Sequence, residues 1–171
     1  QKDMDVGTLN TVVMIQCVGS RQEPRNYCSR VCCPTSLKHA LRLKNANPDL
    51  SVYILYRDMM TIGFAEQYYT AARKAGVIFV QYDLDNPPRV NAATQEGSSL
   101  SVTVLDPILS RPLEIETDLL TLATAIVPNK DEKLANFFKV PLNDDGFFVE
   151  KHAKLGPSEF ATDGVFSMDG D

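Results

Sequence analysis

The residues of this sequence whose types and spacing could do chemistry are its four cysteines. Thiolates are nucleophiles and soft metal ligands, and they select zinc or iron–sulfur clusters over hard cations. All of them fall in one short stretch, CVGSRQEPRNYCSRVCC, which also contains three arginines, a glycine and a proline. The cysteines are Cys17, Cys28, Cys32 and Cys33.

Three interpretations of this cluster fit the residues only in part. Free cysteines are often small core residues, but four in one polar loop are not typical of a core. A structural zinc ion takes four thiolates, but usually from two Cys-x2–4-Cys pairs, and the neighbouring side chains of Cys32 and Cys33 tend to point apart. A dithiol centre is disfavoured because Cys-x-x-Cys is missing. A disulfide between Cys32 and Cys33 would also be strained, since adjacent Cα atoms lie ~3.8 Å apart.

A [4Fe–4S] cluster is the fourth interpretation. It needs one thiolate per iron, and it offers Cys32 and Cys33 separate attachment points. The cysteines also precede a predicted helix, whose N-terminal N–H groups favour an anion such as a thiolate-bound cluster. N–H contacts to the sulfurs would raise its reduction potential, and Arg21, Arg25 and Arg30 could act in the same way. The zinc site stays open as an alternative.

The elements around the cysteines predict an α/β domain with a Rossmann-like parallel sheet flanked by helices, and a small antiparallel β flap. Apolar runs rich in β-branched residues are typical of buried parallel strands. Helices are expected after the cysteines, opening at Pro34, and before Gly76, a residue suited to a left-handed helix end. The strands are expected at residues 11–16, 51–58, 77–83 and 119–129, with an antiparallel pair at 100–107 and 112–118. One domain is expected over residues 1–171.

A plain NAD(P)-binding domain is a further alternative, because the cysteines occupy the first strand-to-helix turn. That turn normally carries G-x-G-x-x-G, whereas this one has only Gly19, which lowers the expectation of nucleotide binding. Arg57 and Asp58, at the end of the second strand, are interpreted as ordinary strand-end residues. His39 and His152 are interpreted as structural or exposed, so no catalytic residue is predicted.

Composition narrows the function classes. The formal net charge of −5 argues against a nucleic-acid partner, because no excess of basic residues is present to neutralise phosphates. The sequence has no apolar run of about 18 residues, so no membrane insertion is predicted. With no apolar signal segment near its first residue, a cytoplasmic location is expected.

The motifs QCVGSR, YCSRVCC, LATAIVP and VPLNDDGFF together resemble the heterodisulfide reductase family, specifically its A subunit and the relatives of that protein. Members of this family are iron–sulfur flavoproteins similar to thioredoxin reductase, and the chain resembles their second Rossmann-like domain, the equivalent of the NADPH domain. The resemblance implies that the four cysteines bind a [4Fe–4S] cluster close to FAD, that the chain is a fragment of a larger multidomain flavoprotein, and that its partners are other subunits of an electron-transfer complex. It implies an oxidoreductase, with the isolated chain inactive by itself.

The sequence departs from the family pattern near its end. The segment after GVF usually continues LAG or AAG, whereas here it reads SMDGD, where Asp169 or Asp171 could approach the flavin. The glycine-rich FAD-binding half of the family fold is missing from this sequence. The resemblance therefore implies that most contacts to FAD come from regions outside it.

Overall fold

A computed structural model describes residues 5–92, 100–129, 131–152 and 155–167. The chain divides into two compact units, Gln1–Ala125 and Ile126–Asp171, and each is described by itself. The expectation of one domain over residues 1–171 stays a prediction.

The first unit is built on a parallel sheet of four strands in the order β3-β2-β1-β7. Strand β1 pairs with β2 on one side and with β7 on the other, and both pairings are parallel. The cysteine stretch follows the central strand, so it begins in the middle of one sheet edge. The strands are β1 (Thr11–Val18), β2 (Ser51–Tyr56), β3 (Ile78–Gln81) and β7 (Leu119–Thr124).

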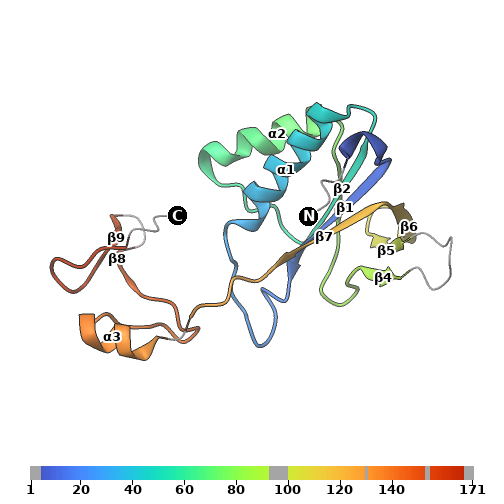
Figure 1. Cartoon of the computed structure of the whole chain (residues 1–171). Helices are drawn as coiled ribbons and strands as arrows, with labels where there is room; N and C mark the ends of the chain where they lie inside the picture. The colour runs from blue at the N-terminus through green and yellow to red at the C-terminus, as the bar shows by residue number, and fades with distance from the viewer. Residues whose placement is uncertain (1–4, 93–99, 130, 153–154, 168–171) are drawn as a thin grey trace. The chain divides into compact units, whose positions relative to one another are not determined.

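Two helices cover one face of this sheet, α1 (Cys32–Ala46) and α2 (Glu66–Lys74), and Figure 1 shows them side by side. Short 3-10 turns precede the first strand, η1 (Val6–Thr8), and the second helix, η2 (Gly63–Ala65). Alternate residues of β1 and β2, such as Val12 and Ile54, pack with Leu37 of α1 into one apolar cluster. Helix α2 ends before Gly76, whose φ of 81° is the left-handed conformation predicted for it.

An antiparallel sheet covers the opposite face. It consists of β4 (Arg89–Asn91), β5 (Leu100–Asp106) and β6 (Arg111–Thr117). Val13 and Leu55, from the other alternate positions of β1 and β2, pack against Val102 of β5. Both faces of the central strands are therefore buried, which explains their continuous apolar sequences.

The predicted fold class is confirmed, with two differences of detail. The predicted flap is a full layer on the parallel sheet, because the face that carries no helix must still be covered. The predicted buried strand at 119–129 is shorter and only half-covered. It is one of the two edge strands of the sheet, and Leu122 is 50% exposed.

The second unit contains a short helix, α3 (Glu132–Phe138), and a hairpin of β8 (Glu150–His152) and β9 (Gly156–Phe160). Asp131 caps α3 by accepting a hydrogen bond of 3.0 Å from the Leu134 backbone N–H. No helix in the described ranges is long and apolar enough to cross a membrane.

Candidate metal centre

Cys17 lies on an irregularity at the end of β1. The pairing of β1 with β7 shifts register between Ile15 and Val18, as in a β-bulge. Cys17 adopts a left-handed conformation with φ 58°, which is uncommon for a residue with a Cβ. Its side chain is buried. A strained backbone beside a chemically active side chain is characteristic of functional sites.

The ten residues after Cys17 fold back on themselves. The backbone N–H of Arg21 donates to the carbonyl of Tyr27 at 3.0 Å, which closes the loop. Inside it, Gln22 and Arg25 exchange backbone hydrogen bonds of 3.2 and 2.7 Å. Because residues 21 and 27 are held together, the long spacer between the first two cysteines returns Cys28 towards the end of β1.

Cys32 and Cys33 are the first two residues of α1. Successive residues of an α-helix point about 100° apart, so these two side chains diverge from one helix end. Cys33 is 5% exposed and its Sγ lies 3.8 Å from the carbonyl oxygen of Asp58, whereas Cys32 is half-buried. The backbone N–H of Arg30 donates to the Sγ of Cys28 at 3.3 Å.

All four cysteines are free thiols, and Cys17 and Cys28 act electrostatically on both Cys32 and Cys33. Burial raises the pKa of Cys33, and the Cys17, Cys28 and Cys32 thiolates raise it further, although a backbone hydrogen bond from Met60 lowers it. Burial also raises the pKa of Cys32, against a hydrogen bond with Ser29 that lowers it. The sulfurs therefore share one region, where several thiolates cannot form cheaply without a compensating cation.

The four thiols supply one donor for each iron of a [4Fe–4S] cluster. No group of three or more His, Cys, Asp or Glu residues in the described ranges is gathered tightly enough to hold one metal ion. A [4Fe–4S] cluster presents one iron to each thiolate and so accepts sulfurs that are spread around it. Four free thiols, two of them on residues that diverge from a helix N-terminus, agree with that requirement in number and chemistry.

Asp58, interpreted from sequence as an ordinary strand-end residue, is part of the site. Its carboxylate forms a 2.5 Å ion pair with Nη2 of Arg21. Arg57 donates from Nη1 to the Arg21 carbonyl at 2.9 Å, and Gln81 donates to the Arg57 carbonyl at 2.9 Å. The end of β2 therefore anchors the cysteine loop. The only sequence signal for this was the position of Arg57 and Asp58 at the carboxyl end of a parallel strand.

A buried polar network lies beneath the cysteines. Gln16 is fully buried and donates from Nε2 to the Ser36 hydroxyl at 2.7 Å. The Tyr82 hydroxyl donates to the Gln16 carbonyl at 2.6 Å. Burial raises the pKa of Tyr82 to about 12. No sequence motif marked these residues, because nothing in their local pattern distinguishes them from core positions.

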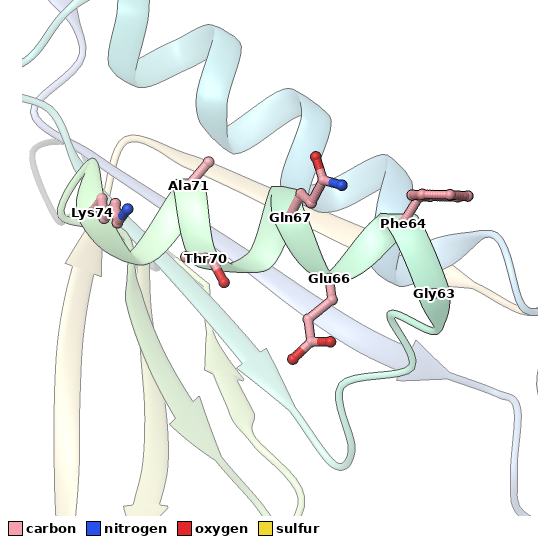
Figure 2. A pocket seen from close by; sticks show the side chains of 7 residues that line it. All are labelled: Gly63, Phe64, Glu66, Gln67, Thr70, Ala71 and Lys74. Carbon is pink, nitrogen blue, oxygen red and sulfur yellow. The ribbon is translucent and has the colours of Figure 1, made fainter.

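A surface pocket lies elsewhere, on η2 and α2. Its volume is about 680 Å³, and Figure 2 shows that Phe64, Glu66 and Lys74 lie along it. It contains no thiol, so it is separate from the cysteine site. Its lining consists of Gly63, Phe64, Glu66, Gln67, Thr70, Ala71 and Lys74.

The remaining predicted site residues lie away from this centre or outside the described ranges. Asp169 and Asp171, predicted to approach a flavin, lie outside the described residues. His39 and His152 are both exposed, as predicted. His152 accepts a 3.1 Å hydrogen bond from the Leu155 backbone N–H.

Sequence comparison finds relatives among archaeal proteins. The chain is 38% identical to the A subunit of the ferredoxin:CoB-CoM heterodisulfide reductase of Methanosarcina acetivorans, over 93% of the chain and 20% of that protein. It is 39% identical to the iron-sulfur A subunit of the CoB–CoM heterodisulfide reductase of Methanocaldococcus jannaschii, over 90% of the chain and 24% of that protein. The chain thus spans a fifth to a quarter of the length of these relatives. No family model matches it.

Structure comparison finds thioredoxin-reductase-like folds. Thioredoxin reductase of T. acidophilum superposes with a TM-score of 0.50 and 16% identity, covering 92% of this chain and 42% of that one. The HOCl-induced flavoprotein disulfide reductase RclA from Escherichia coli gives a TM-score of 0.50 and 14% identity, covering 94% and 31%. The predicted resemblance to the A subunit of heterodisulfide reductase is confirmed by sequence, and the thioredoxin-reductase-like fold by structure.

Proposed function

We propose that this relative of the heterodisulfide reductase A subunit is the electron-transfer domain of an oxidoreductase and holds a [4Fe–4S] cluster on Cys17, Cys28, Cys32 and Cys33. The observation that supports the proposal is that Cys32 and Cys33 begin α1 as free thiols and that Cys17 and Cys28 act electrostatically on both of them. The name of one relative describes it as an iron-sulfur protein, which supports the same chemistry. When bound, the cluster supplies one-electron transfer.

The chain's own residues hold and orient the thiolates. The bulge in β1 turns Cys17 into a buried position, and the closed loop brings Cys28 back towards it. Helix α1 presents Cys32 and Cys33 in diverging directions, with its N-terminal N–H groups beside the negative charge. The backbone N–H of Arg30 contributes a further donor to the Cys28 sulfur.

Access to the site is one-sided. Cys17 and Cys33 are buried, whereas Cys28 and Cys32 are half-buried. In this proposal an electron partner approaches from the side of the two half-buried cysteines, Cys28 and Cys32. FAD, in this proposal, binds on that side, mainly through regions of the full protein outside this chain. Asp169 and Asp171 stay predicted FAD contacts.

The remaining expectations are part of the same proposal. The partners are the other subunits of an electron-transfer complex, since relatives are named as A subunits of heterodisulfide reductases. The location is cytoplasmic. No bond of a substrate is made or broken by this chain alone, so it is inactive when isolated.

The decisive experiment measures iron and acid-labile sulfide in the chain purified without oxygen, with EPR spectra before and after dithionite. About four of each per chain are expected, with a signal that appears on reduction. Cys32→Ser and Cys33→Ser should each lose that signal, and Asn26→Ala, at an exposed position of the same loop, should keep it. Stoichiometric zinc without iron, even after anaerobic reconstitution, would replace this proposal with a zinc-stapled docking domain.

A further inference from the structure

We infer that Arg21 donates a hydrogen bond to the sulfurs of the cysteine site and that Asp58 positions it there, so that this pair sets the reduction potential of the cluster. The inference rests on the proposed function, because it concerns a group held by the same four cysteines. It selects one of the three arginines in the loop and adds a residue from outside the loop.

Two residues at the end of β2 hold Arg21, one at its backbone carbonyl and the other at its guanidinium group. Its Nη2 forms the 2.5 Å ion pair with Asp58, and its carbonyl accepts a 2.9 Å hydrogen bond from Arg57. Its own φ of 58° is left-handed. A long side chain held at its backbone and at its tip has little rotamer freedom left to lose when it makes another contact.

The other guanidinium nitrogen, Nη1, has a donor to spare. It is buried, and no acceptor in the described ranges meets both the distance and the angle of a hydrogen bond to it. A buried polar N–H without a partner is costly, so its presence calls for an explanation. The guanidinium faces Cys17, because the pKa of Arg21 is raised first by the hydrogen bond to Asp58 and then by hydrogen bonding and charge interaction with Cys17. A sulfur of the bound cluster or of its ligands is the acceptor that satisfies Nη1.

The other two arginines of the loop are placed differently. The Arg30 side chain is exposed, and only its backbone N–H contacts a sulfur, that of Cys28. The backbone of Arg25 closes the turn with Gln22, and its side chain makes no hydrogen bond or ion pair within the described ranges. Donors to the sulfurs stabilise the more negative reduced state of a cluster, so Arg21 is the arginine expected to raise the potential.

The test is an EPR-monitored redox titration of the whole chain after anaerobic reconstitution with iron and sulfide. Loss of one charge-assisted hydrogen bond in Arg21→Gln should lower the equilibrium constant for reduction about tenfold, a shift of ~59 mV to more negative potential for a one-electron couple. Arg25→Gln is the matched control, since it removes the same charge from the same loop. The reduction potential of Arg25→Gln should shift by less than a third of the shift expected for Arg21→Gln.

Asp58→Asn separates positioning from simple electrostatics. Removing a negative charge near the cluster would by itself raise the potential. If Asp58 acts by holding Arg21 in place, the potential should fall instead, in the same direction as in Arg21→Gln. Arg21→Lys keeps the charge but not the forked donor, so the reduction potential of this variant should also fall.

Three results would overturn the inference: equal potentials for Arg21→Gln and Arg25→Gln, a raised potential in Asp58→Asn, or an unchanged potential in Arg21→Lys. Should Arg21→Gln fail to hold iron, Arg21→Lys and Asp58→Asn decide the matter. A wild-type chain that takes up no iron and sulfide refutes the proposed function first, and the inference with it, whereas a loaded wild type with unshifted variants refutes the inference alone.

Discussion

The hydroxyl of Tyr82 donates a 2.6 Å hydrogen bond to the backbone carbonyl of Gln16, the residue immediately before Cys17. Tyr82 follows β3, two strands away from β1 in the sheet. Tyr82, which is distant in the sequence, therefore stabilises the bulge that carries Cys17. The Gln16 side chain is bonded in turn to Ser36 of α1, so the strand and helix that carry three of the cysteines are joined through Gln16.

Removing this hydroxyl should destabilise the first unit. Tyr82→Phe keeps the buried ring but leaves the Gln16 carbonyl without this donor, which should lower the free energy of unfolding by about 1 kcal/mol. Urea unfolding of the metal-free protein measures the change. Tyr53→Phe, at a half-buried tyrosine on β2, is the matched control and should change it by less than half as much. Equal effects would mean that the Tyr82 bond adds nothing.

The four thiols should differ in reactivity in the metal-free protein. The half-buried Cys28 should react first with a disulfide reagent such as DTNB, and the buried Cys17 and Cys33 last. Cys32 is half-buried as well, but burial raises its pKa and reduces its thiolate fraction, so it should follow Cys28. Stopped-flow DTNB kinetics on Cys28→Ser should lack the fast phase. If Cys17→Ser is the variant that lacks it, the assignment of the buried positions is wrong.

Loading the site should protect the same thiols. Metal binding needs deprotonated cysteines and occupies them, so all four DTNB phases should be suppressed after anaerobic reconstitution. Denaturation in chelator should restore four reactive thiols per chain, matching the four free cysteines. A phase that survives loading would identify a cysteine that is not a ligand.

Asp118 should make the first unit sensitive to acid. Its Oδ2 accepts hydrogen bonds from the backbone N–H groups of Asn10 at 2.7 Å and Thr11 at 2.9 Å, and the bond from Thr11 is the main cause of its lowered pKa. With a folded pKa below the unfolded one, the unfolded state binds more protons, so this contribution is present above the unfolded pKa and is lost as pH falls through the folded pKa.

The urea midpoint of the wild type should therefore fall more steeply than that of Asp118→Asn as the pH drops from about 5 to 2.5. The asparagine can still accept a hydrogen bond but does not titrate. Asp85→Asn, which removes an exposed carboxylate from the same unit, should follow the wild-type curve. Parallel curves for wild type and Asp118→Asn would contradict the prediction.

Lys139 should limit the stability of α3. It ends the helix with φ 54° and ψ 39°, a left-handed conformation that costs a residue with a Cβ about 1 kcal/mol. Lys139→Gly removes this strain and should slow amide hydrogen exchange in α3 by a corresponding amount. Lys139→Ala is the control, because it shortens the side chain but keeps the Cβ, and it should leave exchange unchanged. Equal protection in both variants would show that the backbone conformation is not the cause.

Much of the framework could be predicted from sequence because its signals are local. β-branched apolar runs indicated the buried strands β1, β2 and β3, and Gly76 indicated the end of α2. Whether a strand lies at the edge or in the centre of the sheet, by contrast, depends on which other strands pair with it. The strand at Leu119–Thr124 has an apolar sequence like the others, but only the order β3-β2-β1-β7 leaves it half-covered.

The sequence alone determined the identity of the candidate ligands, because four thiols clustered before a helix are a local pattern of residue type and spacing. Tertiary structure decided how they are held. The bulge at Cys17, the closed loop that returns Cys28, the anchoring of Arg21 by Asp58 and the brace from Tyr82 all join residues far apart in the chain. Such contacts arise only when the strands pair in the sheet. Parallel backbone hydrogen bonding between β1 and β2 places the carboxyl ends of both strands at the same edge.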